Sequence, residues 1–222
     1  MTTRRAKIAA PQLPAVVLPE LEPVPSDGAF VGRAERHEAL LFDRTTFEGR
    51  DLGGSDFIEC QFSGVNLNEA QLRGATFRES VLAEPFAPVL MAARSTWQDV
   101  QISNPRWGSA ELYEGGWRSV TVDGGKLDYV NLRGSSLMDV QFKNCIIGEL
   151  DLAQCKAQRI SFSDCSIGTL DVSGAKLKDV DLRTTEFSQL NGLGSLEGLV
   201  IDEYQLSLLA PLLAAHLGIS VR

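Results

Sequence analysis

Large apolar residues recur at every fifth position through most of the chain. One run covers residues 42–82 and another covers residues 112–187, and Trp97, Ile102 and Trp107 keep the same phase between them. An α-helix repeats every 3.6 residues and a strand every two, so neither explains the spacing. A period held over so many units predicts a repeat architecture in which every fifth residue points inward.

The position two residues before each large residue is also apolar or small. Each five-residue unit therefore has two inward and three outward positions, and four units form a square coil of 20 residues, stacked at the strand spacing of about 4.8 Å. Constant core volume requires large residues on two opposed walls and small ones on the other two. The large second inward residues are Val130, Leu150 and Leu170 on one wall and Val140, Ile160 and Val180 on the opposite wall.

The four cysteines form no CxxC pair, which fits a reduced, cytoplasmic protein better than a disulfide scaffold. Cys145 and Cys165 are expected one above the other, within the Cα separation that a disulfide can span. We interpret them as a buried ladder of free thiols. His37 and His216 lie outside the repeats, and the sequence predicts no metal site and no cofactor.

The segments VNLNE-AQLRG-ATFRE-SVLAE and VNLRG-SSLMD-VQFKN resemble pentapeptide-repeat proteins, whose unit is A(D/N)LXX. The resemblance covers about residues 40–190 and implies an all-β fold, a right-handed quadrilateral β-helix. It departs from the family pattern where the second inward residue is Val, Ile or Leu instead of Ala.

The remaining segments complete the predicted domain organisation. Residues 1–27 are proline-rich and predict a flexible tail, and residues 28–41 an N-terminal cap. The β-helix is predicted over 42–190, interrupted around 83–96, where Ala87 and Ala92 are weak repeat residues. Residues 191–222 predict a helical cap and dimerisation segment.

Asp202 is suited to cap a helix that is apolar around much of its circumference, and Pro211 is expected to kink or split that helix. Such a helix needs two burial surfaces, the open end of the β-helix and a second subunit, which predicts a homodimer. The residues assigned to dimerisation are Tyr204, Leu208, Leu209, Leu212, Leu213 and Leu217.

The pattern LEGLVIDEYQLSLL followed by LGISV resembles the C-terminal tail of Qnr-type quinolone-resistance proteins. In that family the tail forms the dimer contact, and the rod resembles duplex DNA and binds DNA gyrase or topoisomerase IV. The resemblance implies the same partners here, and residues 83–96 as a loop of the kind that interrupts some of those rods.

Net charge is −8 with a pI near 4.9, which disfavours direct binding of nucleic acid, and no segment is apolar enough to suggest a membrane span. No nucleophile–base pair, paired carboxylates or phosphate loop predicts an enzyme, so no catalytic residue is assigned.

A DNA mimic needs carboxylates in a ladder that replaces phosphates. Glu111, Asp151 and Asp171 are expected to stack with Asn131 on one face as the partner-binding surface. The neighbouring face is basic, through Lys156, Lys176, Lys178, Arg118 and Arg159. The alternative is an interaction scaffold of unknown partner without topoisomerase activity, with Tyr113 and Tyr129 as outward contact residues.

Overall fold

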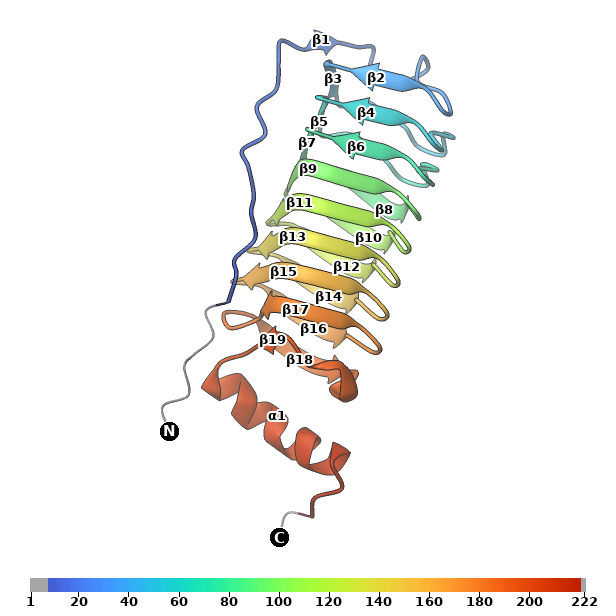
Figure 1. The fold of residues 1–222 in the computed structure, drawn as a ribbon. Coiled ribbons are helices and arrows are strands. Elements are labelled where there is room, and N and C mark those ends of the chain that lie inside the picture. The colour runs from blue at the N-terminus through green and yellow to red at the C-terminus, as the bar shows by residue number, and fades with distance from the viewer. Residues whose placement is uncertain (1–7, 221–222) are drawn as a thin grey trace.

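The computed structural model describes residues 8–220, which form a β-solenoid of about 9 turns (Figure 1). Each turn consists of 20 residues, because strands pair in parallel with partners 20 positions away. Leu137 lies opposite Ala157, and Phe142 lies opposite Phe162. The predicted fold class and the four-unit coil are confirmed.

The strands belong to two sheets, both built from parallel pairs. The larger contains β1 (Glu22–Pro23), β2 (Arg36–Glu38), β3 (Leu40–Asp43), β4 (Asp56–Ile58), β5 (Gln61–Ser63), β6 (Thr76–Arg78), β7 (Val81–Ala83), β9 (Thr96–Ser103), β11 (Gly116–Asp123), β13 (Ser136–Lys143), β15 (Lys156–Ser163), β17 (Lys176–Asp181) and β19 (Leu199–Val200). The smaller contains β8 (Phe86–Met91), β10 (Arg106–Glu111), β12 (Lys126–Asn131), β14 (Ile146–Asp151), β16 (Ser166–Asp171) and β18 (Glu186–Asn191).

The residues at every fifth position form the core, as predicted. All of them from Phe42 to Leu182 are buried, and Phe187 in the last turn is partly buried. Aromatic rings stack along one wall: the centroid of Trp97 lies 4.2 Å from that of Phe77 and 5.6 Å from that of Trp117. The period also reaches His37, whose ring stacks on Phe57 one turn away at 5.3 Å.

The expected interruption at residues 83–96 is wrong. β8 pairs with β10 in the regular 20-residue register, and Ala87 and Ala92 are fully buried core residues. Trp107 lies directly opposite Ala87, and Trp97 follows in the same turn. These bulky indoles occupy space that the alanines leave, which keeps the core close-packed without a loop.

The second inward positions also lie in the core. Val140, Leu150 and Ile160 are buried inside continuous strands, and the cysteines occupy small-residue positions. All four cysteines are free and buried, as expected for Cys145 and Cys165. Burial raises the pKa of Cys60 and of Cys155 to about 11, which keeps these thiols protonated at neutral pH.

The C-terminal segment closes the last turn through η1 (Leu193–Ser195), β19 and α1 (Glu203–His216). Asp202 caps α1 in a capping box with Gln205. The Gln205 side-chain amide also donates to the carbonyls of Leu182 and Thr185 at 2.6 and 2.7 Å, which ties the helix to the open edge. The helix continues through Pro211, so the expected split does not occur.

The described part of the expected flexible tail, residues 8–27, is not free. It runs along the side of the solenoid from the last turns to the first, where β1 pairs with β3 (Figure 1). The next residues lie against the first turn, where the ring of Phe30 stacks on that of Phe42 at 6.3 Å. Residues 1–7 lie outside the described part of the chain.

Candidate partner-binding surfaces

The structure brings the predicted acidic residues into one column. Glu111 lies opposite Asn131, Asn131 opposite Asp151, and Asp151 opposite Asp171, on β10, β12, β14 and β16. A strict 20-residue coil makes this alignment unavoidable. The stacking that the sequence predicted is therefore present, and the three side chains differ in what they offer to a partner.

Asp151 is not an outward-facing charge, in contrast to the prediction. Its residue is only 5% exposed, and its carboxylate accepts from the Ala153 amide at 2.8 Å and pairs with the Arg133 guanidinium at 3.0 Å. Glu111 and Asp171 are half-buried; Glu111 accepts from the Asn131 side-chain amide at 2.8 Å. The column therefore offers two partly accessible carboxylates instead of three.

Tyr129 lies beside this column at a half-buried position. Burial, together with the charges of Asp151, Glu111 and Glu149, raises its pKa above the ordinary value, so the phenol stays protonated and able to donate. Tyr113 is also half-buried and lines a shallow crevice with Met91. Both predicted aromatic contacts are thus less exposed than the sequence suggested.

The basic residues on the neighbouring face are partly neutralised. Lys156 and Lys176 lie opposite each other in β15 and β17. Arg159, in contrast, pairs with Asp139 through two contacts of 2.6 Å, and the Arg159 hydrogen bond holds the pKa of Asp139 below its ordinary value. The acidic and basic residues still lie on neighbouring faces, as predicted, but each face has fewer unpaired charges than the sequence suggested.

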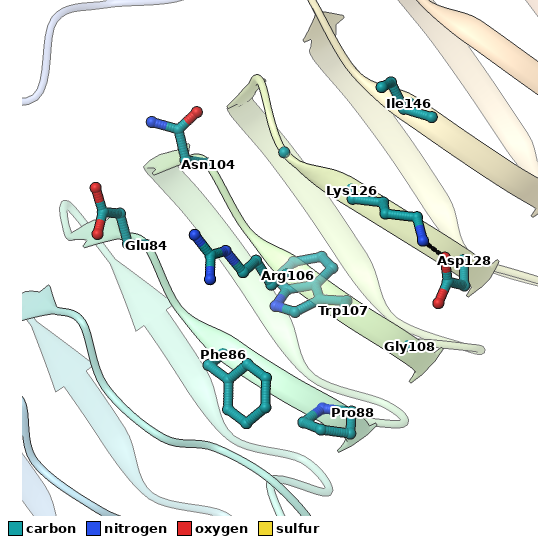
Figure 2. Close-up of a pocket in the computed structure, with 11 residues that line it drawn as sticks. Glu84, Phe86, Pro88, Asn104, Arg106, Trp107, Gly108, Lys126, Asp128 and Ile146 are labelled. Atoms are coloured by element: carbon teal, nitrogen blue, oxygen red, sulfur yellow. Dashed lines mark ion pairs between the residues drawn. The ribbon is translucent and has the colours of Figure 1, made fainter.

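A groove of about 620 Å³, which the sequence did not predict, crosses the outer face of the smaller sheet (Figure 2). Phe86, Arg106, Lys126 and Ile146 line it at 20-residue intervals, so a comparison of outward residues turn by turn would have found it. Gly108 is required at its floor, because a Cβ there would lie 2.3 Å from the Pro88 carbonyl oxygen. Lys126 pairs with Asp128 at 3.3 Å.

Helix α1 presents apolar residues in two directions. Leu209 is buried and Leu213 packs partly against the core, whereas Tyr204, Leu208, Leu212 and Leu217 are exposed. The exposed fraction is 73% for Tyr204 and 70% for Leu217. The helix thus covers the end of the solenoid and retains an apolar outer face, the feature on which the dimer prediction depends.

Residues 8–220 contain no cluster of ligating side chains suited to a metal ion. His37 is buried, and desolvation lowers its pKa; His216 lies at the end of α1. No helix among the described residues is long and apolar enough to cross a membrane.

Comparison with known proteins finds a family match for part of the chain. Residues 41–78 match the family described as pentapeptide repeats, in eight copies. Residues 41–78 therefore carry the repeat of that family, and the 20-residue coils continue beyond them through β18. A search of curated proteins found no match.

Two solved structures are similar to this chain over most of its length. Full-length QnrB1, a plasmid-mediated fluoroquinolone resistance protein, is 21% identical, with 89% of this chain and 95% of that chain covered and a TM-score of 0.41. HetL, a pentapeptide repeat protein involved in heterocyst differentiation regulation from the cyanobacterium Nostoc sp. strain PCC 7120, is 13% identical, with 77% and 91% covered and a TM-score of 0.37.

Proposed function

We propose that this protein is a non-enzymatic binding protein that offers the side of its solenoid to a protein partner. The observation that carries the proposal is the unbroken register. Outward residues form straight columns at 20-residue intervals, such as the one from Glu111 to Asp171. Solenoids use such extended surfaces for recognition.

We propose a type II topoisomerase, DNA gyrase or topoisomerase IV, as the first partner to test. The C-terminal sequence pattern and the acidic balance of the chain support this choice. The repeat region, residues 40–190, contains 21 Asp and Glu against 15 Lys and Arg. A basic groove that accepts DNA responds to such an excess of negative charge.

The charge density limits how closely the rod copies DNA. About 9 turns at about 4.8 Å give a rod of roughly 43 Å, so a net charge of −8 is about one charge per 5 Å. Duplex DNA carries one per about 1.7 Å. The rod therefore has about one third of the charge density of the duplex, and shape must contribute to its binding.

The test is supercoiling by purified gyrase, titrated with this protein to tens of micromolar, with a quinolone absent and present. We expect inhibition without the drug, or protection with it, that weakens as salt rises. Glu111→Lys combined with Asp171→Lys should remove the effect. The matched control is Glu84→Lys with Asp164→Lys, which makes the same charge change at exposed positions of another column.

No effect of the unmodified protein in either arm would reject the topoisomerase as partner. The remaining proposal would then be an interaction scaffold for another protein, which the regular 20-residue register supports as well as it supports a topoisomerase partner. An equal loss in both double variants would show that total charge matters and the Glu111–Asp171 column does not.

A further inference from the structure

The N-terminal strap, residues 8–19, lies on one corner of the solenoid. The amide of Ala9 donates to the Asp179 carboxylate at 3.3 Å, and that of Gln12 donates to the Asp139 carboxylate at 2.8 Å. Farther along, residues 14–17 line a crevice together with Glu79 and Asp99. All four acidic residues are separated by whole 20-residue turns and occupy the same corner of the solenoid, which we name the corner column.

The strap advances along the corner column as an extended chain. From Ala9 to Gln12 it crosses two turns, which is about 9.6 Å at the strand spacing. Three residues of polyproline II helix span about 9.3 Å, so the two lengths agree. Pro11, Pro14 and Pro19 favour this conformation, because proline fixes φ near −65°.

The corner column is the most acidic of the four corners. Five of its eight positions carry a carboxylate, whereas each of the other three corners carries at most two between residues 34 and 189. The eight positions are Ala39, Glu59, Glu79, Asp99, Ser119, Asp139, Arg159 and Asp179.

The same column contains no glycine, although every position needs a positive φ. The φ values lie between 49° and 57°, a conformation that costs a side-chain-bearing residue roughly 1–2 kcal/mol. At another corner, glycine relieves that cost at Gly54, Gly74, Gly134 and Gly174, while the positions between them keep side chains at a positive φ. Ten non-glycine residues at other corners also adopt a positive φ, so this cost is not peculiar to the corner column. What distinguishes the column is that all eight of its positions carry a side chain.

The strap is held only weakly. Its inward side chains Ile8, Pro11, Leu13, Val16 and Leu18 are all half-buried, and none of residues 8–19 is fully buried. Val17 is 82% exposed. Segments with few buried apolar contacts open at low free-energy cost, so the strap is able to leave while the coils stay folded.

We propose that the corner column is a binding track for a basic, extended segment of a partner protein, and that the strap covers it as a releasable autoinhibitory ligand. The strap shows how the track binds a chain, through amide donors to carboxylates. Removing the strap uncovers the half-buried carboxylates of Asp99 and Asp179, which with the exposed Glu79 are then open to a more basic competitor. The inference goes beyond the proposed function and does not depend on a topoisomerase.

The test begins with the full chain, folded, carrying a specific protease site inserted between Pro19 and Glu20, which are both exposed. After cleavage we expect residues 1–19 to separate from the rod in gel filtration at 1 µM, with the circular dichroism of the coils unchanged. Co-elution of the cut peptide with the rod after dilution would show that it is a permanent part of the fold and would overturn the proposal.

Rebinding measures what the track recognises. A labelled synthetic peptide of residues 1–19 should bind the stripped rod saturably in fluorescence anisotropy. The double variant Glu79→Gln with Asp99→Asn should weaken this binding at least threefold. The control double variant, Glu84→Gln with Asp164→Asn, lies at positive-φ positions of another corner and should weaken binding by less than 1.5-fold. Equal weakening by both pairs would refute a specific role for the corner column.

An octalysine peptide serves as the probe of autoinhibition. It should bind the stripped rod at least fivefold more tightly than the uncut protein, and the difference should shrink as salt increases. Equal binding to cut and uncut protein would show that the strap does not cover the surface, and would overturn the autoinhibitory part of the proposal.

Discussion

The single substitutions Trp97→Phe and Trp117→Phe should lower the stability of the fold by very different amounts, although the two indoles stack in adjacent turns of the same wall. Both are fully buried. The Trp97 indole N–H donates to the Ser95 hydroxyl at 2.7 Å, whereas that of Trp117 has no partner among residues 8–220. At the equivalent position before Trp117 the chain has Gly115, which carries no hydroxyl.

Both substitutions remove the same atoms and leave a similar cavity. The loss of stability caused by the cavity is therefore about equal in the two variants and cancels when they are compared. Trp97→Phe also loses a hydrogen bond worth about 0.5–1.5 kcal/mol, and Trp117→Phe removes an unpaired buried donor that costs about 1–3 kcal/mol. Trp97→Phe should therefore lower the free energy of unfolding by about 1.5–4.5 kcal/mol more than Trp117→Phe does.

Guanidinium unfolding followed by circular dichroism measures the difference, provided that the slopes of the two transitions agree. Ser95→Ala supplies the control. Made in the Trp97→Phe background, it should cost about 1 kcal/mol less than in the unmodified protein, because the indole bond is already absent. Equal costs for the two tryptophan variants would refute the reasoning and indicate that the Trp117 donor is satisfied.

Three further predictions concern charge, assembly and the thiols. Arg159 lowers the pKa of Asp139 below its ordinary 3.8, so the pair should stabilise the fold above pH 3.8 and lose this contribution as the pH falls through the lowered pKa. In urea unfolding, Arg159→Gln should therefore make the free energy of unfolding depend less on pH in this acid range. Leu208→Glu with Leu212→Glu on the exposed face of α1 should convert a dimer to a monomer in sedimentation, and a monomeric parent would remove the basis of the dimer prediction. The four buried cysteines should react with a thiol reagent only on unfolding, and rapid labelling of the native protein would contradict their inward placement.

The period-five pattern is sufficient by itself to place nearly every core residue from Phe42 to Leu182. Each unit is local, and a 20-residue coil stacks only on its neighbours, so the register found in one turn fixes the next. The same rule aligns Glu111, Asp151 and Asp171 in one column. The period also holds at Ala87 and Ala92, where the small side chains had suggested an interruption. That expectation was wrong because core volume is shared between turns, so a small residue in the period does not require a loop.

The amino-acid pattern is therefore enough to show which residues point inward, whereas the roles of the outward residues depend on contacts that form only in the folded chain. Asp151 is neutralised by Arg133, 18 positions earlier, and that pairing depends on how two side chains meet across adjacent turns. The strap contacts Asp139 from 127 positions away, through a proline-rich segment that has no period to reveal its path. Backbone periodicity is a local property, whereas the charges that remain free for a partner depend on contacts between distant parts of the chain.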